Sequence, residues 1–212
     1  MEKAHSAETL KEKQRKNIKL VFLILVGIAA VSILALMLLN WLLPEKEEPA
    51  PPKIYFYPRT DENIFENSDY LALNRSVYYC DDPTGYGVTT QITEADRHTF
   101  DPEVQFAETY LILLTLGDRS TLRSLCTENY LKEQEIPDFS QQMIYDSYIY
   151  YHSTQGQEDG SRLVTYRLEY KIYQNNGSYR QDVGSDASKP EYLVLWVSPS
   201  GDDVKIENIL RS

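Results

Sequence analysis

The 212-residue sequence contains little cysteine, histidine and glycine, with two, three and nine residues respectively. The cysteines and histidines show none of the paired spacings of a zinc site. The chain also lacks a glycine-rich phosphate loop, a serine-centred nucleophile elbow and paired catalytic carboxylates at a recognisable spacing. We therefore predict neither a metal nor a cofactor.

Basic residues are scarce in most of the chain. The full sequence has 21 Lys and Arg against 32 Asp and Glu, and residues 1–43 hold six of the basic and three of the acidic residues. Residues 44–212 therefore carry a net charge of -14. Such a body repels phosphate groups, which argues against nucleic acid as a partner and against docking on anionic lipid.

A long uncharged stretch covers residues 20–43 and is rich in Leu, Ile, Val and Ala. As a helix, this stretch would extend about 36 Å, enough to cross the hydrocarbon core of a bilayer. A cleaved signal peptide has an apolar core of only about 7–15 residues and ends at small residues, whereas here Leu42-Leu43-Pro44-Glu45 follows. We predict an uncleaved, single-pass transmembrane helix, and hence the membrane as one partner.

The charges that flank this stretch predict its orientation. Residues 1–19 form a basic tail that includes all six basic residues of the N-terminal part, and residues 45–48 contain three glutamates and one lysine. Because the more basic flank normally stays in the cytoplasm, we expect the N-terminus to be cytoplasmic. The C-terminal 169 residues would then lie outside the plasma membrane.

The next two segments connect the membrane to the main domain. Residues 44–52 contain four prolines and three glutamates, a composition typical of an extended linker, which we place at 44–60. In residues 61–98 two short strands, 77–80 and 87–92, flank a turn-rich stretch. We interpret 61–98 as an arm or hairpin that packs on the main domain.

Residues 99–212 form the main domain, and they begin with helical signals. Asp101 can cap a helix, Pro102 suits its first turn, and Gly117 supplies a stop. Apolar residues recur at helical spacing between them. A second helix is expected after Asp118 and a short third one from Thr127.

After Pro137 the hydrophobic period changes from helical to alternating. Strands are expected at 143–153, 162–173, 191–198 and 204–210, with polar turns between them. Helices followed by a four-strand meander indicate an α+β fold. We predict N-terminal helices packed on one face of a curved antiparallel sheet.

The segment 107–118, which ends in Gly117-Asp118, resembles the opening helices of the nuclear-transport-factor-two-like superfamily, a cystatin-like α+β cone. The ending 204–209 resembles the final strand of that superfamily. The resemblance covers about residues 99–212 and implies a cone-shaped fold that serves enzymes, ligand binders and scaffold parts. Fold alone does not choose among these functions. The overall organisation is similar to that of uncharacterised single-pass surface proteins of Gram-positive bacteria.

Candidate site residues come from the strands and the first helix. Asp146 interrupts a strand rich in Tyr and Ile, and His152 follows six residues later. A desolvated carboxylate beside tyrosine hydroxyls could act as a general base, but both residues could equally face water. We name no catalytic residue. If a ligand cavity exists, we expect Tyr110, Asp146, Tyr166, Tyr170 and Trp196 to line it.

Cys80 and Cys126 leave two alternatives open. Both would lie outside the membrane, where a disulfide could join the arm to the second helix. They could equally be free and buried.

These patterns favour a non-catalytic domain of the cell envelope that binds a protein partner or a small-molecule ligand, or acts as a scaffold. The alternative is a small-molecule lyase or isomerase that uses the cone cavity. The enzyme alternative requires an enclosed cavity into which Asp146 or His152 points. A cavity filled by Leu and Tyr side chains would count against it.

Overall fold

The computed structural model describes residues 25–28, 31–38, 53–59, 63–84 and 86–211. The chain divides into two compact units, Met1–Pro52 and Lys53–Ser212. In the first unit, residues 25–28 and 31–38 are helical with exposed side chains. Among the described residues, no helix is both long and apolar enough to cross a membrane. The remainder of the stretch 20–43, the tail 1–19 and the linker up to residue 52 lie outside the described residues.

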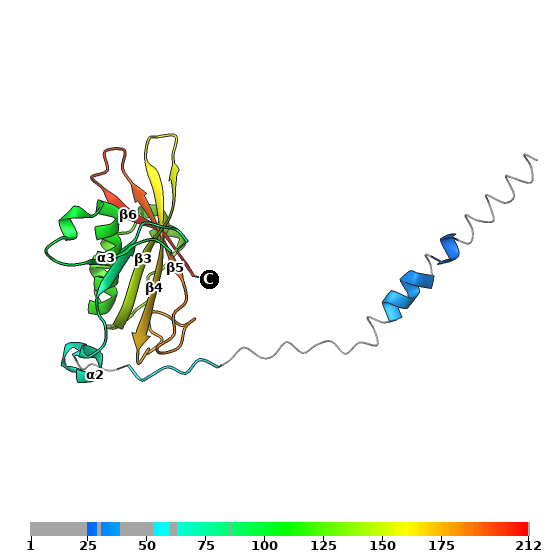
Figure 1. Ribbon diagram of the computed structural model, residues 1–212, viewed down its shortest axis with the longest axis horizontal. Helices are drawn as coiled ribbons and strands as arrows, with labels where there is room; N and C mark the ends of the chain where they lie inside the picture. Colours follow the sequence, from blue (N-terminus) through cyan, green and yellow to red (C-terminus); the bar gives the residue numbers. More distant parts are fainter. Residues whose placement is uncertain (1–24, 29–30, 39–52, 60–62, 85, 212) are drawn as a thin grey trace, which may run out of the picture. The chain divides into compact units, whose positions relative to one another are not determined.

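The second unit is an α+β fold built on a six-stranded sheet (Figure 1). The strands are β1 (Val77–Cys80), β2 (Thr89–Ile92), β3 (Met143–Gly156), β4 (Arg162–Tyr173), β5 (Glu191–Val197) and β6 (Val204–Arg211). Their order across the sheet is β2-β1-β3-β4-β5-β6.

The predicted meander is confirmed in strands β3 to β6, which pair antiparallel in chain order. The sheet is mixed, however, because β1 pairs parallel with β3, Val77 lying opposite Ser147. The two strands of the arm therefore extend the main sheet. A parallel pair needs a long crossover, and the helices between β2 and β3 supply it.

The helices follow their sequence signals except at Asp101, which stands at the N-cap of the helix beginning at Pro102 but makes no side-chain cap hydrogen bond within the described residues. The described helices of this unit are η1 (Ile64–Glu66), α2 (Ser68–Leu71), η2 (Arg97–Thr99), α3 (Pro102–Leu116), α4 (Arg119–Ser124) and α5 (Glu128–Glu133). Pro102 occupies the first turn of α3, and Gly117 ends that helix with a φ of 68°. The side chains of Asp118 and Thr127 cap α4 and α5.

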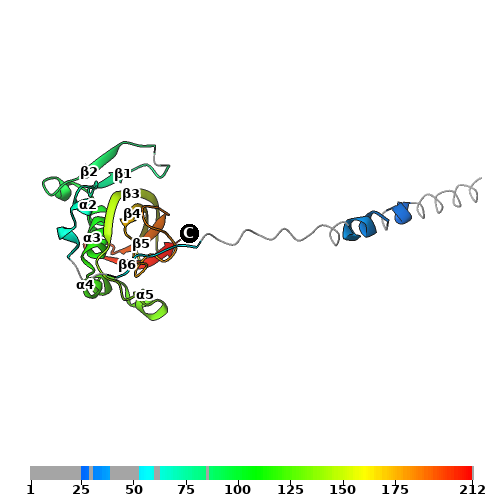
Figure 2. The same ribbon diagram turned by 90° about the horizontal axis from the view of Figure 1, so that it is seen from below.

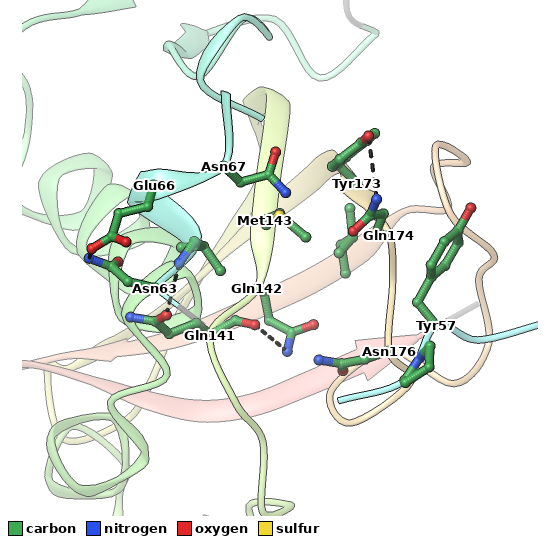
Figure 3. Close-up of a pocket in the computed structure, with 13 residues that line it drawn as sticks. Tyr57, Asn63, Glu66, Asn67, Gln141, Gln142, Met143, Tyr173, Gln174 and Asn176 are labelled. Carbon is green, nitrogen blue, oxygen red and sulfur yellow. Dashed lines mark hydrogen bonds between the residues drawn. The ribbon is translucent and has the colours of Figure 1, made fainter. Parts of the chain in front are cut away.

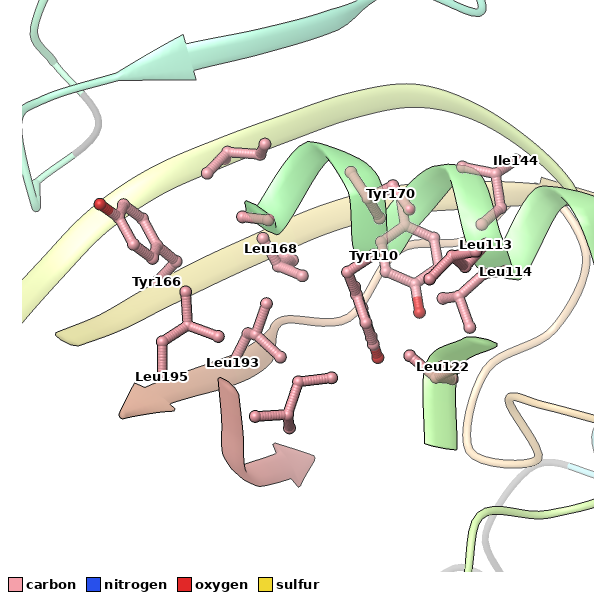
Figure 4. Close-up of a cluster of buried hydrophobic side chains, with 14 of the residues drawn as sticks. Tyr110, Leu113, Leu114, Leu122, Ile144, Tyr166, Leu168, Tyr170, Leu193 and Leu195 are labelled. Carbon is pink, nitrogen blue, oxygen red and sulfur yellow. The ribbon is translucent and has the colours of Figure 1, made fainter. Parts of the chain in front are cut away.

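Helix α3 covers one face of the sheet, as seen along the strands in Figure 2. Its buried residues, among them Ala107, Leu111 and Leu114, meet the inward side chains of β3, β4 and β5 (Figure 4). In β4 the burial alternates strictly, so that Leu168 and Tyr170 point to the core and Arg167 and Glu169 point away from it. Burial of this apolar face is the main force that holds helix and sheet together.

The long connection 174–190 between β4 and β5 folds back on itself. Asn175 is fully buried, and its side-chain amide donates to the carbonyl oxygens of Arg180 and Val183. Residues 53–59, which the sequence assigns to the linker, run along this loop, and the amide of Tyr57 donates to the carbonyl oxygen of Asn175. Gly177 is required at this crossing because an added Cβ would lie 2.7 Å from the ring of Phe56.

Candidate functional site

Two of the predicted cavity residues, Tyr110 and Tyr170, meet in the core on a buried carboxylate. Their hydroxyl groups donate to Oε1 of Glu191 at 2.6 and 3.1 Å. Both tyrosines and Glu191 are at most 2% exposed, and the Tyr179 hydroxyl adds a hydrogen bond to that of Tyr110. Burial first, and then the neighbouring carboxylate, hold the pKa of Tyr110 and of Tyr170 well above the usual range.

Two arginines balance the charge of Glu191. Arg211 Nε donates to its Oε2 at 2.8 Å, and Arg180 Nη1 lies 3.9 Å from the same oxygen. Arg180 is 1% exposed and also pairs with Asp182 at 2.7 Å. Buried charges are stable only when they are paired and hydrogen-bonded, so this cluster fastens the loop 174–190 and β6 to the core.

Tyr166 is buried at the other end of the core, where its ring packs against Tyr151 at a centroid distance of 6.3 Å. It therefore belongs to the hydrophobic core, as do the neighbouring Leu168 and Leu193. Figure 4 shows Tyr, Leu and Ile side chains occupying the space between α3 and the sheet. Buried core side chains therefore occupy the space in which we expected a cone cavity.

Asp146 does not line that space, and the prediction that it does is wrong. It lies at a β-bulge between Tyr145 and Tyr148 with a φ of 47°. Its carboxylate accepts from Lys171 Nζ at 3.0 Å, and Lys171 is on the outward side of β4. The bulge turns the strand locally, which a regular alternation along the sequence could not reveal.

His152 and Trp196 also lie away from the core. His152 is exposed at a second bulge, and its ring lies 5.2 Å from that of Tyr192. Trp196 pairs with Leu163 and Lys205 on the neighbouring strands, and all three line an open groove near the ends of the hairpins. The expectation that Trp196 lines the core cavity is therefore wrong.

The two cysteines are free and buried. Cys80 is the last residue of β1. Cys126 forms an isolated parallel β-bridge with Ile206 of β6, which lies at the opposite end of the strand order. Of the two alternatives from the sequence, the structure contains the free thiols and not the disulfide.

A different site lies where β3 begins and β4 ends, and a pocket of about 540 Å³ opens there (Figure 3). Because Asn and Gln side chains dominate its lining, we call it the amide pocket. Its lining residues are Tyr57, Pro58, Asn63, Ile64, Glu66, Asn67, Gln141, Gln142, Met143, Ile172, Tyr173, Gln174 and Asn176.

The floor of the amide pocket is fixed by the end of α3. The backbone N–H of Gln142 donates to the carbonyl oxygen of Leu114, one of the last carbonyls of that helix. Gly117 allows this approach, because a Cβ there would lie 2.7 Å from the backbone nitrogen of Gln141. The helix stop seen in the sequence thus also positions the pocket.

The walls come from two segments that are far apart in the sequence. On one side lie Asn63 and Asn67, the N-cap residues of η1 and α2, and the Gln141 side chain accepts from the backbone N–H of Ile64 at 3.4 Å. On the other side the end of β4 contributes Gln174, which has a φ of 48°. Non-glycine residues adopt such a φ only where the surrounding structure holds them there.

Gln142 is the unusual residue of this pocket. It is 1% exposed, and its Nε2 donates to Ser140 O at 2.7 Å and to Ser178 Oγ at 3.0 Å. These contacts fix the orientation of the carboxamide, because only the nitrogen can donate to a carbonyl. Its Oε1 has no hydrogen-bond partner among the described residues and faces the side where Gln174 and Asn176 lie (Figure 3).

An unpaired buried acceptor is costly, typically by about 1–3 kcal/mol, so native proteins rarely keep one without a reason. Here the reason is available in the geometry, because the atom belongs to a residue that lines a pocket. The Oε1 atom is itself buried, so a donor that enters the amide pocket would satisfy Gln142 once the carboxamide or a neighbouring side chain shifts.

Among the described residues, the lining of the amide pocket contains no basic side chain and a single carboxylate, Glu66. Glu66 is exposed and accepts from the side chain of Asn63 at 3.3 Å. Within the described part of the chain, no group of three or more His, Cys, Asp or Glu side chains could hold a metal ion. Apart from Glu66, the polar side chains of the described lining are therefore neutral amides and phenols, which bind by hydrogen bonds.

Sequence reasoning missed both the Glu191 cluster and the amide pocket. The alternation of β5 did contain a signal for the first, since Glu191 shares the inward side with Leu193 and Leu195. Nothing comparable marks Gln142, because its role depends on how the loop 174–190 returns to β3. Comparisons with models of protein families, with curated proteins and with solved structures give no match to this chain.

Proposed function

We propose that the protein is a single-pass plasma-membrane protein whose C-terminal unit lies outside and serves as a non-catalytic binding or scaffold domain of a cell-envelope assembly. The uncharged stretch 20–43 and the basic tail before it support this placement. The acidic character of residues 44–212 fits a domain that needs a tether to stay near the membrane.

The unpaired Oε1 of Gln142 in the amide pocket carries the proposal of binding. Carboxamides neither gain nor lose protons near neutral pH, so they recognise ligands without general acid or base chemistry. A pocket lined mainly by such groups is suited to hold a ligand rather than to transform it.

The lyase or isomerase alternative lacks the geometry that it requires. Asp146 and His152 point away from the core, and the core space is filled by side chains such as Tyr110 and Leu168.

Membership of the nuclear-transport-factor-two-like superfamily remains our proposal for the domain 99–212. The helix ending at Gly117-Asp118 and the succession of helices and then strands support it. This proposal concerns ancestry and fold, and the binding function does not depend on it.

The binding function is tested with the full-length chain in lipid nanodiscs and a fractionated cell-envelope extract, using NMR signals of the side-chain amides. We expect at least one fraction to shift the signals of Gln142 and Gln174. The variant Gln134→Asn, at the exposed end of α5 and outside the amide pocket, serves as the control and should respond as the wild type does. Chemical conversion of an extract component by the protein, or no shift with any fraction, would contradict the proposal.

A further inference from the structure

We infer that the ligand of the amide pocket is a neutral sugar of one or two rings, bound through its hydroxyl groups. This inference rests on the proposed binding function and names the class of ligand. It is carried by the buried acceptor of Gln142 together with the composition of the lining.

The charges of the pocket lining argue against an anionic or a cationic ligand. The described residues of the lining offer no Lys, Arg or His to an anion, and the part of the chain that contains the pocket has a net charge of -14. In the described lining, a cation would find only Glu66, an exposed carboxylate that is already hydrogen-bonded to Asn63. A neutral ligand pays no such desolvation penalty for an unpaired charge.

The polar groups of the pocket include both acceptors and donors. Gln142 holds a buried acceptor beside the pocket. The Oε1 of Gln174 is another acceptor, since among the described residues only the side-chain nitrogen of Gln174 is engaged, at 3.4 Å to Tyr173. The side-chain oxygen of Asn67 caps α2, and the side-chain oxygen of Gln141 accepts from the backbone N–H of Ile64. The side-chain nitrogens of both residues are left as donors. A hydroxyl group both donates and accepts, so a ligand rich in hydroxyls can satisfy this mixture.

Two aromatic rings stand beside these amides. Tyr57 is 50% exposed, and Tyr173 is half-buried at the end of β4. Figure 3 shows both on the same side of the pocket as Gln174. Aromatic faces offer a flat apolar surface with a polar tip, which suits the C–H face of a sugar ring whose edges carry hydroxyls.

The size of the pocket agrees with a small ligand. Its volume of about 540 Å³ lies within the range of roughly 300–1,000 Å³ that is usual for small-molecule sites. An extended peptide would instead be held mainly through the main-chain groups of an exposed strand edge. Because the polar groups identified here are side-chain amides, we favour the sugar.

The test uses the full-length chain in lipid nanodiscs, without sugar-based detergents, and ligand-observed NMR. The probes are glucose, N-acetylglucosamine, cellobiose and N,N'-diacetylchitobiose, with glucuronate as the charged counterpart and trialanine amide as the peptide. We expect at least one neutral sugar to bind and both glucuronate and the peptide to bind at least about tenfold more weakly, because a charge or an unmatched polar group would be left in the site.

Two variants connect binding to the pocket. Gln174→Asn keeps a residue type that tolerates the φ of 48° and withdraws the carboxamide by one methylene. Gln142→Met removes the buried acceptor. We expect each variant to weaken sugar binding about tenfold, whereas Gln134→Asn should leave sugar binding unchanged. If Gln142→Met does not fold, Gln174→Asn alone decides.

The outcomes separate this inference from the proposed function. Binding of glucuronate or of the peptide in preference to every neutral sugar would overturn the inference that the ligand is a neutral sugar. Sugar binding that Gln174→Asn leaves intact would overturn it as well. If no sugar binds while an envelope fraction still shifts the NMR signals of Gln142 and Gln174, the inference of a sugar ligand is wrong and the binding function stands. If neither binds, both fail.

Discussion

Replacing Glu191 by glutamine tests how the loop 174–190 and β6 are held to the core. The carboxylate of Glu191 is fully buried, and it accepts from Tyr110, Tyr170 and Arg211. The glutamine keeps the shape and can still bond the two phenols, because a hydroxyl also accepts. It removes the negative charge that faces Arg211.

The size of the effect follows from that unpaired charge. Removing one partner of a buried ion pair costs about 3–5 kcal/mol. The Arg211 side chain is 32% exposed, so water offsets part of this cost, and Arg180 keeps its pair with Asp182. We expect a loss of about 2–4 kcal/mol in the free energy of unfolding, out of the 5–15 kcal/mol typical of a domain. The corresponding drop in Tm is on the order of 10 °C.

The assay is urea unfolding of the full-length chain in nanodiscs, followed by tryptophan fluorescence and circular dichroism. Glu128→Gln is the matched control, because its carboxylate is 92% exposed and pairs only with Lys132 at 3.8 Å. The control should lose less than about 0.5 kcal/mol. An equally small loss for Glu191→Gln would refute the assignment of this cluster as a fastening of the core.

Three further predictions concern a glycine, the thiols and the tyrosines. Gly117→Ala should destabilise the domain by more than about 1 kcal/mol in the same assay, because φ is 68° and the new Cβ would meet Gln141; an unchanged midpoint would contradict this. Cys80 and Cys126 should react with a maleimide only after unfolding, and a reductant should leave Tm unchanged, since both thiols are free and buried; rapid labelling of the native chain would be the opposing result. Burial raises the pKa of Tyr70 from 10.0 to about 12, so the folded state keeps a proton that the unfolded state loses, and stability should fall as pH rises from 10 toward 12. Unfolding free energies that stay constant over this interval would show that the phenol is not desolvated.

The sequence predicts much of the fold because local signals and tertiary packing agree in this domain. Pro102 and Gly117 mark the ends of α3, and the alternation in β4 identifies its buried side residue by residue. Each of these features depends on neighbours along the chain, so it can be recognised without knowing the rest of the structure.

The candidate site depends on contacts that have no local signal. The bulge at Asp146 interrupts the alternation of β3, so the faces of the residues before and after it do not follow one regular period. The parallel pairing of β1 with β3 and the return of the loop 174–190 to Ser140 and Gln142 are decided by packing between distant segments. Only the folded chain brings these groups together.

A crystal structure of the chain with the tightest-binding disaccharide would test the central claim most directly. We predict a sugar hydroxyl within hydrogen-bond distance of Gln142 Oε1, about 2.7–3.0 Å, with the ring beside Tyr57 or Tyr173 in the amide pocket. Density for the sugar between α3 and the sheet, or at the outer groove beside Trp196, would contradict the account.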